Sequence, residues 1–417
     1  MNAGRPLTIG MVAGEASGDR LGAPLIRELR RQHSGVRLVG IGGPCMAAEG
    51  LSSLVDIERL SVNGLVDPLL RLPSLLRILF KVRDEVLAAG ADCFVGIDFN
   101  FFNLLLAGML KRRGLATVHY VSPTVWAWRR GRLRRIARAV DRMLTLYPFE
   151  ADIYRQHGIA VSYVGHPAAY EIGTEDGLAG QASARARLSL PAPAEGKWVA
   201  ILAGSRGREV ELTGKDFLQA AELLCDQVEG FVIPAANEQR YSQLMRLLSA
   251  ASLELQGKTR LLLGDARLAM TAADAVMVNS GTATLEALLL RKPMVMSYRL
   301  GPLSYALVSR MMKIKWFALP NILAGRELVK EFIQTAAKPA DIALAVSELL
   351  QAGDKASLLS AYDEIHKQLQ PGGSGPGQLA AQAVLETVDD ISARGGSSLN
   401  DCGELSEVKN KGKDVPA

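Results

Sequence analysis

The fold of this 417-residue chain is limited most by the alternation of short apolar runs with longer helical patterns. Each run is apolar at consecutive positions, which is typical of a strand covered on both faces. Strands of this kind, when helices separate them, form parallel sheets with helices on both faces. The sequence therefore predicts an α/β protein.

The predicted strands form two groups, at 8–13, 36–41, 93–97, 117–121 and 143–146, and at 198–202, 231–233, 260–263, 275–278 and 294–297. The stretch 174–196 between the groups is rich in Gly, Ala, Pro and Glu and has no strand pattern. We expect Rossmann-like domains at 1–180 and 190–355, C-terminal helices at 356–391 and a disordered tail at 392–417. Ligands of such sheets bind beyond the carboxyl ends of the strands, so we expect a substrate cleft between the domains.

The composition excludes several classes of protein. The net charge is +5, and the four cysteines lie far apart, which suits a reducing compartment. Neither they nor the five histidines have metal-ligand spacing, so we expect no metal site. No uncharged apolar run reaches the roughly 18 residues of a membrane span. Because the N-terminus leads into a strand without a signal peptide, we expect a cytoplasmic protein.

The most informative turn follows the predicted strand at 275–278. Ser280, Gly281 and Thr282 stand at the start of a helical pattern, where free backbone N–H groups attract phosphate. Glu286 falls about one turn inside this helix, where its carboxylate can accept hydrogen bonds from a ribose. A site for both a diphosphate and a ribose indicates a nucleotide-sugar enzyme, and hence glycosyl transfer.

Two turns in the first half place carboxylates at strand ends. In the turn from Gly14 to Gly18, glycine admits a ligand close to the backbone, and Glu15 can hold sugar hydroxyls. The alternative is an ordinary strand-to-helix turn with Ser17 or Asp19 as the helix cap, and Glu15 argues against it. Asp98 ends a strand beside aromatic residues, and partial desolvation makes a carboxylate more basic. Asp98 is therefore the candidate general base, with a helix cap as the alternative.

Arg206 follows the first strand of the second half. Its guanidinium can neutralise the negative charge on a leaving diphosphate. The alternative is a solvated loop arginine that forms a local ion pair with a neighbour such as Glu209.

The glycine-rich stretch 40–43 lacks the spacing and the downstream acidic residue of a dinucleotide-binding fingerprint. We therefore expect no cofactor.

Three segments are basic and apolar or aromatic. The stretch 126–142 has seven arginines and two tryptophans, which fits nucleic acid, anionic lipid, a phosphorylated substrate or a solvated helix face. Because no nucleic-acid motif accompanies it, we expect no nucleic-acid partner. The segments 69–83 and 303–317 each fit a core helix, an acyl-chain pocket or a membrane-facing patch.

Taken in order, several of these motifs resemble the lipid-A-disaccharide synthase family. The resemblance extends over about residues 8–385, and its matching stretches are VAGEASGD (12–19), VGID (95–98), HYVSPTVWAWR (119–129), GSRG with EVE (204–211), SGTATLE (280–286) and LPNILAGRE (319–327). It implies a GT-B architecture, two Rossmann-like domains with parallel sheets facing a central cleft, and no metal requirement. It also implies an inverting transfer of 2,3-diacylglucosamine from UDP-2,3-diacylglucosamine to 2,3-diacylglucosamine 1-phosphate (lipid X), with release of UDP.

The resemblance also assigns residues and partners. By it, Asp98 is the catalytic base, the sugar side contains Gly14, Glu15, Ser17 and Gly18, and the UDP side contains Arg206, Ser280, Gly281, Thr282, Glu286, Asn321 and Arg326. The acylated substrates imply peripheral association with the cytoplasmic face of the inner membrane, and a homodimer is compatible with the family. The chain departs from the family pattern at Phe101, where a second acidic residue is common, at Ala203 and at 168–170.

Two other functions fit parts of the pattern. A UDP-N-acetylglucosamine 2-epimerase-like enzyme shares the fold and would act on a nucleotide sugar without acyl chains. A non-catalytic nucleic-acid or membrane adaptor would use the arginine-rich stretch and would not bind UDP.

Overall fold

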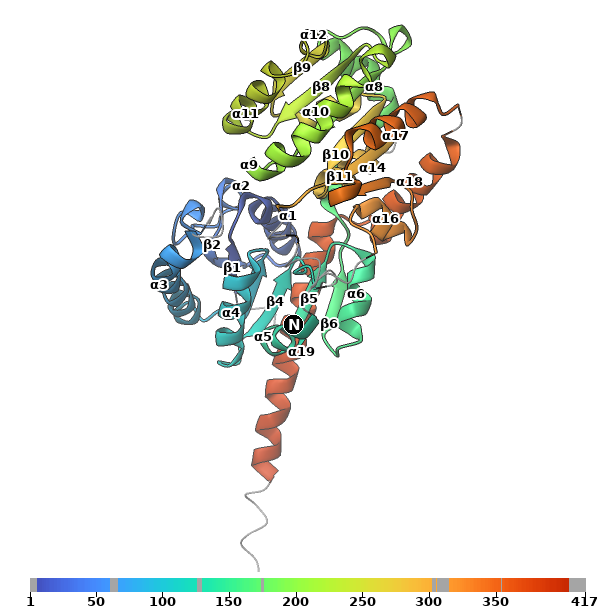
Figure 1. Ribbon diagram of the computed structural model, residues 1–417. Helices are drawn as coiled ribbons and strands as arrows, with labels where there is room; N and C mark the ends of the chain where they lie inside the picture. The colour runs from blue at the N-terminus through green and yellow to red at the C-terminus, as the bar shows by residue number, and fades with distance from the viewer. Residues whose placement is uncertain are drawn as a thin grey trace, which may run out of the picture. The chain divides into compact units, whose positions relative to one another are not determined.

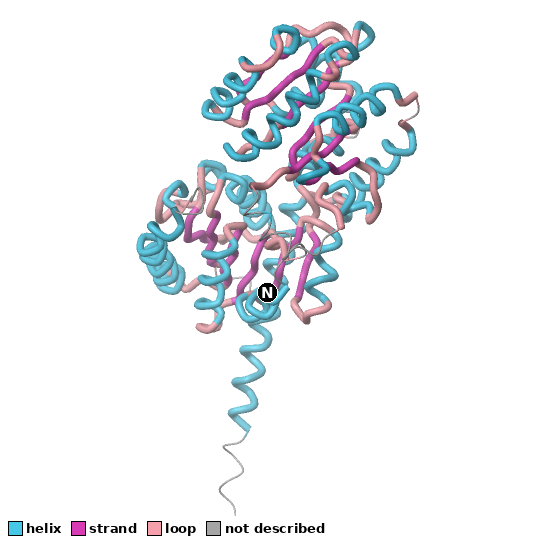
Figure 2. Tube along the Cα trace, viewed as in Figure 1, coloured by secondary structure: helices cyan, strands magenta, loops and turns pink. Residues whose placement is uncertain are grey.

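The computed structural model describes residues 6–60, 67–125, 130–173, 176–301, 305, 315–353 and 355–404 (Figure 1). They form two compact units, the first from Met1–Gly165 and Pro371–Ala417 and the second from His166–Gln370. Each unit contains a six-stranded parallel sheet, and helices alternate with the strands along the chain (Figure 2). The predicted α/β class with two Rossmann-like halves is confirmed.

The first sheet has the strand order β2-β1-β3-β4-β5-β6, and all neighbouring strands are parallel. The strands are β1 (Thr8–Ala13), β2 (Arg37–Ile41), β3 (Cys93–Ile97), β4 (Ala116–Tyr120), β5 (Arg142–Thr145) and β6 (Ala160–Tyr163). The helices of this unit are α1 (Ala16–Gln32), α2 (Pro44–Ala48), α3 (Asp67–Ala88), α4 (Asn100–Lys111), α5 (Leu133–Ala139), α6 (Pro148–Arg155) and α19 (Pro376–Glu404).

Two apolar cores lie on opposite faces of this sheet. On one face, Met11 of β1 belongs to a core with Leu25 of α1 and Val384 of α19. On the other face, Val12 belongs to a core with Val82 of α3. Successive strand residues point to opposite faces, so one strand serves both cores only if it is apolar at every position.

The second sheet has the strand order β12-β11-β10-β7-β8-β9 and is also parallel. Its strands are β7 (Trp198–Leu202), β8 (Gly230–Ala235), β9 (Thr259–Leu263), β10 (Ala275–Asn279), β11 (Met294–Tyr298) and β12 (Lys330–Ile333). The helices are α7 (Pro167–Glu171), α8 (Asp176–Arg187), α9 (Gly207–Glu209), α10 (Lys215–Glu222), α11 (Glu238–Ser249), α12 (Leu253–Lys258), α13 (Ala266–Ala272), α14 (Thr282–Leu289), α16 (Leu319–Ala324), α17 (Pro339–Gln351) and α18 (Ala356–Gln368). No helix of the part of the chain described above is long and apolar enough to cross a membrane.

Each strand predicted from the sequence is present, and two further strands were missed. These are β6 and β12, which lie at sheet edges and contain four residues each. Both are partly exposed rather than fully buried, and β12 begins with Lys330 and Glu331. An edge strand with one open side does not need a continuous apolar run, so it gives no strong sequence pattern.

The second unit begins earlier than the predicted break at 174–196. Helix α8 lies inside that stretch, and its residue Arg185 is fully buried. The Arg185 guanidinium forms an ion pair with Asp274 (2.6 Å) and donates hydrogen bonds to the carbonyls of Ala272 and Gly196 (both 3.0 Å). Asp274 also accepts from the N–H of Trp198 (2.8 Å). A single buried arginine therefore joins a stretch of low hydrophobicity to the second sheet.

The C-terminal part of the chain is shared between the units. Helix α18 belongs to the second unit, whereas α19 packs along α1 of the first. Arg142 of β5 reinforces this packing through ion pairs with Glu386 (3.1 Å) and Asp390 (3.2 Å). Helix α19 continues to Glu404, so residues 392–404 of the predicted disordered tail are helical, and 405–417 lie outside the described residues.

We expect Arg185→Met to lower the free energy of unfolding by about 3–5 kcal/mol, because it leaves the Asp274 carboxylate with only the exposed Lys197 ammonium, 3.7 Å away, as a cationic partner. Arg187, two residues later on α8, is exposed, and Arg187→Met should change stability by less than about 0.5 kcal/mol. Denaturant unfolding of both variants measures the difference. Equal stabilities would show that the buried ion pair does not hold α8 in place.

Candidate functional site

The predicted site residues of the first unit lie where the strand order of its sheet reverses. The chain passes from β1 outward to β2 and then returns to β3 on the other side of β1. In this register Ala13 is paired with Ile97, so the turns that begin at Gly14 and Asp98 are neighbours. Ligands of open parallel sheets bind at such a reversal, beyond the carboxyl ends of the strands.

Asp98 is half-buried and contacts the other turn directly. The Ser17 hydroxyl donates a hydrogen bond of 3.3 Å to Oδ2 of Asp98. Asp98 and Phe99 both have left-handed backbone conformations, with φ of 51° and 42°. Two consecutive non-glycine residues in this region carry backbone strain, which is typical of functional turns when the surrounding structure holds them.

Asn103 of α4 holds this strained turn. Its amide nitrogen Nδ2 donates to the carbonyl oxygens of Val12 (3.1 Å), Ile97 (3.2 Å) and Asp98 (2.9 Å), and its side chain is fully buried. The backbone N–H of Asn103 also donates to the carbonyl of Phe99 (3.2 Å). The sequence prediction missed Asn103, although a polar amide within the otherwise apolar run of α4 indicates a buried side chain that needs hydrogen-bond partners.

Gly14 and Gly18 have packing roles in this turn. A Cβ atom on Gly14 would lie only 2.3 Å from Cγ of Phe99, and one on Gly18 would lie 3.2 Å from the carbonyl oxygen of Ile97. The Phe99 ring therefore packs against Gly14, and a ligand contact at Gly14 stays a prediction. Residues 15–17 are exposed, and Glu15 and Ser17 carry the polar side chains among them.

His119 is the other buried polar group near Asp98. Its Nε2 lies 2.9 Å from Oδ1 of Asn100, the first residue of α4. Burial lowers the pKa of His119 to about 3, so the imidazole is neutral at physiological pH. A neutral imidazole donating to Asn100 orients the start of α4, and Asp98 stays the only candidate base among these groups.

The glycine-rich stretch 40–43 already has an anion bound to it. The buried carboxylate of Asp19 accepts hydrogen bonds from the N–H groups of Gly43 (2.8 Å), Cys45 (2.9 Å) and Met46 (2.9 Å). These N–H groups stand at the start of α2, where a helix attracts an anion, and Asp19 already occupies them. Asp19 thus caps α2 rather than α1, and the stretch is a structural turn.

The second sheet reverses its strand order between β7 and β10, and the predicted UDP-side turns follow these two strands. Leu202 of β7 is paired with Val278 of β10. Gly204 has a φ of 113°, and a Cβ atom there would lie 2.9 Å from Nδ2 of Asn279. The Arg206 turn and the Ser280 turn are therefore neighbours, as the two turns of the first unit are.

Arg206 is held by its backbone and has an exposed head group. The Glu209 carboxylate accepts from the N–H groups of Ser205 (3.1 Å) and Arg206 (3.2 Å), and it pairs with Nη1 of Arg206 (3.0 Å). The local ion pair foreseen as the alternative is thus present. The Arg206 side chain is nevertheless 82% exposed, and a guanidinium has five N–H donors, so it can also bind a phosphate.

The turn before α14 keeps its helix N-terminus open to solvent. Gly281 has a φ of 141°, and both Gly281 and Thr282 are exposed. The Thr284 hydroxyl donates to the carbonyl of Gly281 (2.8 Å) and accepts from the N–H of Leu319 (3.3 Å), while Ser280 contacts the carbonyl of Phe317 (3.5 Å). Glu286 is half-buried on the same helix. The free N–H groups of this first turn can accept an anion.

Asn321, predicted on the UDP side, is held within its own loop. Its side chain is fully buried, and its amide nitrogen donates to the carbonyl of Val329 and to Glu331 (both 2.8 Å). Its oxygen accepts from the N–H groups of Leu328 (2.7 Å) and Val329 (2.9 Å). All four hydrogen-bonding positions of the amide are used, so the side chain of Asn321 positions the loop, and the part of Asn321 in UDP binding stays a prediction.

Glu331 completes this loop and was missed by sequence reasoning, because it lies on an edge strand. Its carboxylate accepts from the N–H groups of Phe317 and Ala318 (both 2.9 Å). Burial raises the pKa of Glu331, and these hydrogen bonds oppose the rise. The same loop exposes Arg326 after Gly325, whose φ is 65°. Arg326 is therefore available to a ligand, whereas Asn321 and Glu331 hold the loop.

A sequence profile of the family described as lipid-A-disaccharide synthetase matches residues 9–384. The chain belongs to this family. The lipid-A-disaccharide synthase of Sodalis glossinidius is 44% identical over 388 residues, which cover 92% of this chain and 99% of the relative. Among the residues described, no three His, Cys, Asp or Glu side chains gather as metal ligands.

Solved structures support the GT-B architecture expected of a lipid-A-disaccharide synthase family member. A glycosyltransferase from Rickettsia africae has a TM-score of 0.57 at 10% identity and covers 93% of this chain and 99% of its own. A UDP-GlcNAc 2-epimerase from Neisseria meningitidis, bound to UDP-GlcNAc, has a TM-score of 0.57 at 15% identity. The match covers 92% of this chain and 99% of the epimerase chain. At these identities the likeness shows the fold alone, so it does not favour the epimerase alternative.

We expect Gly14→Ala to lower turnover about 100-fold, because the added methyl group displaces Phe99 and with it Asp98, and a misplacement of about 1 Å at a reacting centre can cost about that much. The double variant Gly14→Ala/Phe99→Ala should recover at least about tenfold of that loss. Gly257→Ala is the control, since a Cβ there meets nothing within 4 Å. Turnover of Gly14→Ala within twofold of the wild type would contradict the proposed packing.

Proposed function

We propose that this chain transfers 2,3-diacylglucosamine from UDP-2,3-diacylglucosamine to 2,3-diacylglucosamine 1-phosphate. The product is the β-1,6-linked disaccharide 1-phosphate, and UDP is released. The nearly full-length family match carries the proposal, and it makes the chain a glycosyltransferase of lipid A biosynthesis. The arrangement of carboxylate and cationic groups at the two strand reversals is consistent with that chemistry.

Asp98 acts as the general base in this scheme. Its carboxylate removes the proton from the primary hydroxyl of the acceptor as the oxygen attacks the anomeric carbon of the donor. The new C–O bond forms on the face opposite UDP, and the bond to the diphosphate oxygen breaks in the same step. A single displacement inverts the anomeric configuration. Glu15 and Ser17, exposed beside Asp98, bind hydroxyl groups of the sugar.

The second unit supplies positive charge to the leaving group. The Arg206 guanidinium and the N–H groups at the start of α14 stabilise the negative charge that the diphosphate gains. A backbone hydrogen bond and an ion pair to Glu209 hold the Arg206 turn in place, and the guanidinium stays exposed. Glu286 accepts hydrogen bonds from the ribose, and Arg326 adds a second cation on the exposed loop.

The direct test is incubation with UDP-2,3-diacylglucosamine and 2,3-diacylglucosamine 1-phosphate, followed by mass analysis. A disaccharide 1-phosphate together with UDP supports the proposal. Conversion of UDP-N-acetylglucosamine to its epimer, with no disaccharide, would support the epimerase alternative and refute the transferase.

We expect Asp98→Asn to lower kcat by about 10²–10⁴-fold, the usual contribution of a general base, because the amide cannot accept the proton. UDP affinity should stay within twofold, since Asp98 and the UDP-side turns belong to different units. Turnover and UDP binding by calorimetry are the measurements. A variant with near-normal kcat would rule Asp98 out as the base.

We also propose peripheral binding to the cytoplasmic face of the inner membrane through α3. Leu72, Leu76 and Phe80 lie four residues apart on one face of this helix and are 38%, 36% and 44% exposed. Arg83 lies over the Phe80 ring, with its guanidinium carbon 5.0 Å from the ring centroid. An apolar row bordered by basic groups is typical of an interfacial helix. Of the other predicted segment, 303–317, residues 303–304 and 306–314 lie outside the described residues.

We expect the double variant Leu76→Glu/Phe80→Glu to lose at least about tenfold of its affinity for anionic phospholipid vesicles, because both changes replace apolar contact with negative charge. Leu344→Glu is the matched control, since Leu344 is 62% exposed on α17 and should leave vesicle binding unchanged. Co-flotation with vesicles measures both. A wild-type protein that does not float with the vesicles would refute the peripheral proposal.

A further inference from the structure

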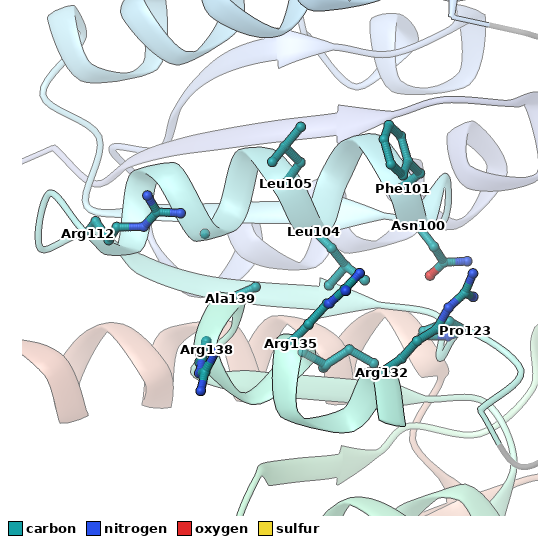
Figure 3. Close-up of a pocket in the computed structure, with 12 residues that line it drawn as sticks. Asn100, Phe101, Leu104, Leu105, Arg112, Pro123, Arg132, Arg135, Arg138 and Ala139 are labelled. Atoms are coloured by element: carbon teal, nitrogen blue, oxygen red, sulfur yellow. The ribbon is translucent and has the colours of Figure 1, made fainter. Parts of the chain in front are cut away.

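A cavity of about 910 Å³ lies between α4 and α5 of the first unit. Figure 3 shows its lining residues, which include Asn100, Phe101, Leu104 and Leu105 of α4, and Gly108 of the same helix also lines the cavity. Its volume is near the upper end of the roughly 300–1,000 Å³ usual for small-molecule sites. We call this cavity the α4–α5 groove. Its other wall is formed by residues of the arginine-rich stretch 126–142, namely Arg132, Arg135 and Arg138. Residues 126–129 of that stretch lie outside the described residues.

The floor of the α4–α5 groove is apolar. Leu104, Leu105, Ile136 and the backbone of Gly108 line it, and Phe101 stands at one end. Phe101 is 72% exposed and Leu105 is 39% exposed, although both are large apolar side chains. Apolar side chains exposed beside a cavity indicate a site for an apolar ligand.

The walls of the groove are cationic. Arg112, Arg132, Arg135 and Arg138 all line it, and Figure 3 shows Arg132 and Arg135 reaching from the α5 side towards α4. Within the described part of the chain, no carboxylate forms an ion pair with Arg112, Arg135 or Arg138. An apolar floor with arginine walls is complementary to a molecule that has both an acyl chain and an anionic group.

The groove starts beside the candidate base. Asn100 lines one end and is two residues from Asp98, while Arg112 lines the other end. At about 1.5 Å per residue, the α4 helix separates these two ends by roughly 18 Å. An extended chain that begins at the sugar held by Asp98 can therefore follow α4 away from the reacting centre.

We propose that the α4–α5 groove binds the acceptor, with one acyl chain along α4 and the phosphate on Arg132 and Arg135. This inference rests on the proposed function, because it names the part of the first unit that receives the acceptor. The phosphate distinguishes the two substrates. The donor carries its phosphates as UDP, for which the second unit has its own cationic groups, whereas the acceptor carries a separate phosphate on the sugar whose hydroxyl Asp98 deprotonates.

A larger side chain at Gly108 tests the proposal, because it would occupy the groove from the α4 side. A Cβ atom there would lie 3.7 Å from Cβ of Ala139, an ordinary contact, so the site admits a side chain. Gly257→Ala, on α12 of the second unit, is the control and should keep both KM values within twofold, since a Cβ there meets nothing within 4 Å. Gly108→Leu extends into the groove and should raise the acceptor KM at least tenfold while the donor KM changes less than twofold. Steady-state kinetics with varied acceptor, in detergent micelles, measure the split.

Two further measurements identify the parts of the ligand. In the wild type, each methylene removed from the acyl chain in the groove should raise the acceptor KM by about fourfold, and Gly108→Leu should flatten this dependence. Arg135→Gln should weaken binding of the phosphorylated acceptor about tenfold or more and leave binding of the dephosphorylated acceptor within twofold. Isothermal calorimetry with both acceptors measures the second effect.

Several outcomes would overturn the assignment. An unchanged acceptor KM in Gly108→Leu, or a rise in the donor KM instead, would show that the acceptor does not occupy the groove. Loss of binding to anionic vesicles with unchanged acceptor KM would assign the groove to the membrane surface. If the wild type forms no disaccharide, the proposed function fails. Direct binding of the acceptor then still tests the groove, because the acceptor should bind the wild type and should bind Gly108→Leu more weakly.

Discussion

The structure depends above all on how each parallel sheet reverses its strand order. Beside β1 and β3 in the first unit, and beside β7 and β10 in the second, neighbouring strands lead to helices on opposite sides. Ligands of open parallel sheets bind beyond the carboxyl ends of the strands at such a reversal. Asp98 with Ser17, and Arg206 with the Ser280 turn, lie at these reversals. The hydrogen-bonded registers thus bring together residues that are more than 70 positions apart in the sequence.

Around the first reversal, buried hydrogen bonds stabilise a strained backbone. The left-handed conformations of Asp98 and Phe99 are unfavourable by themselves, and Asn103 compensates with hydrogen bonds to the surrounding carbonyls. Inside the protein these bonds are strong, because little water competes for them. The candidate base is therefore held on a rigid support, whereas Arg206 in the second unit is anchored through its backbone and keeps an exposed head group.

How well an element could be predicted depended on its burial. Central strands such as β3 and β10 are apolar throughout because both faces are covered, and this makes them visible in the sequence. The edge strands β6 and β12 and the helix α8 lack that pattern. Arg185 anchors helix α8 through its ion pair with Asp274. Because Asp274 lies 89 residues later in the chain, nothing in the local sequence shows that pairing. Likewise, Asn321 matched a family motif, but only its contacts reveal that its amide is fully used within the protein.

The sequence by itself determined the α/β class, the two halves, the family and the identity of the turns, because these are recorded in local patterns of burial and in short motifs. Only the tertiary structure decided which turns become neighbours, that Phe99 occupies the space at Gly14, that Asp19 fills the glycine-rich turn, and that α19 returns to the first unit. Each of these depends on contacts between residues far apart in the chain. Such contacts arise from strand order and packing, which local patterns do not specify.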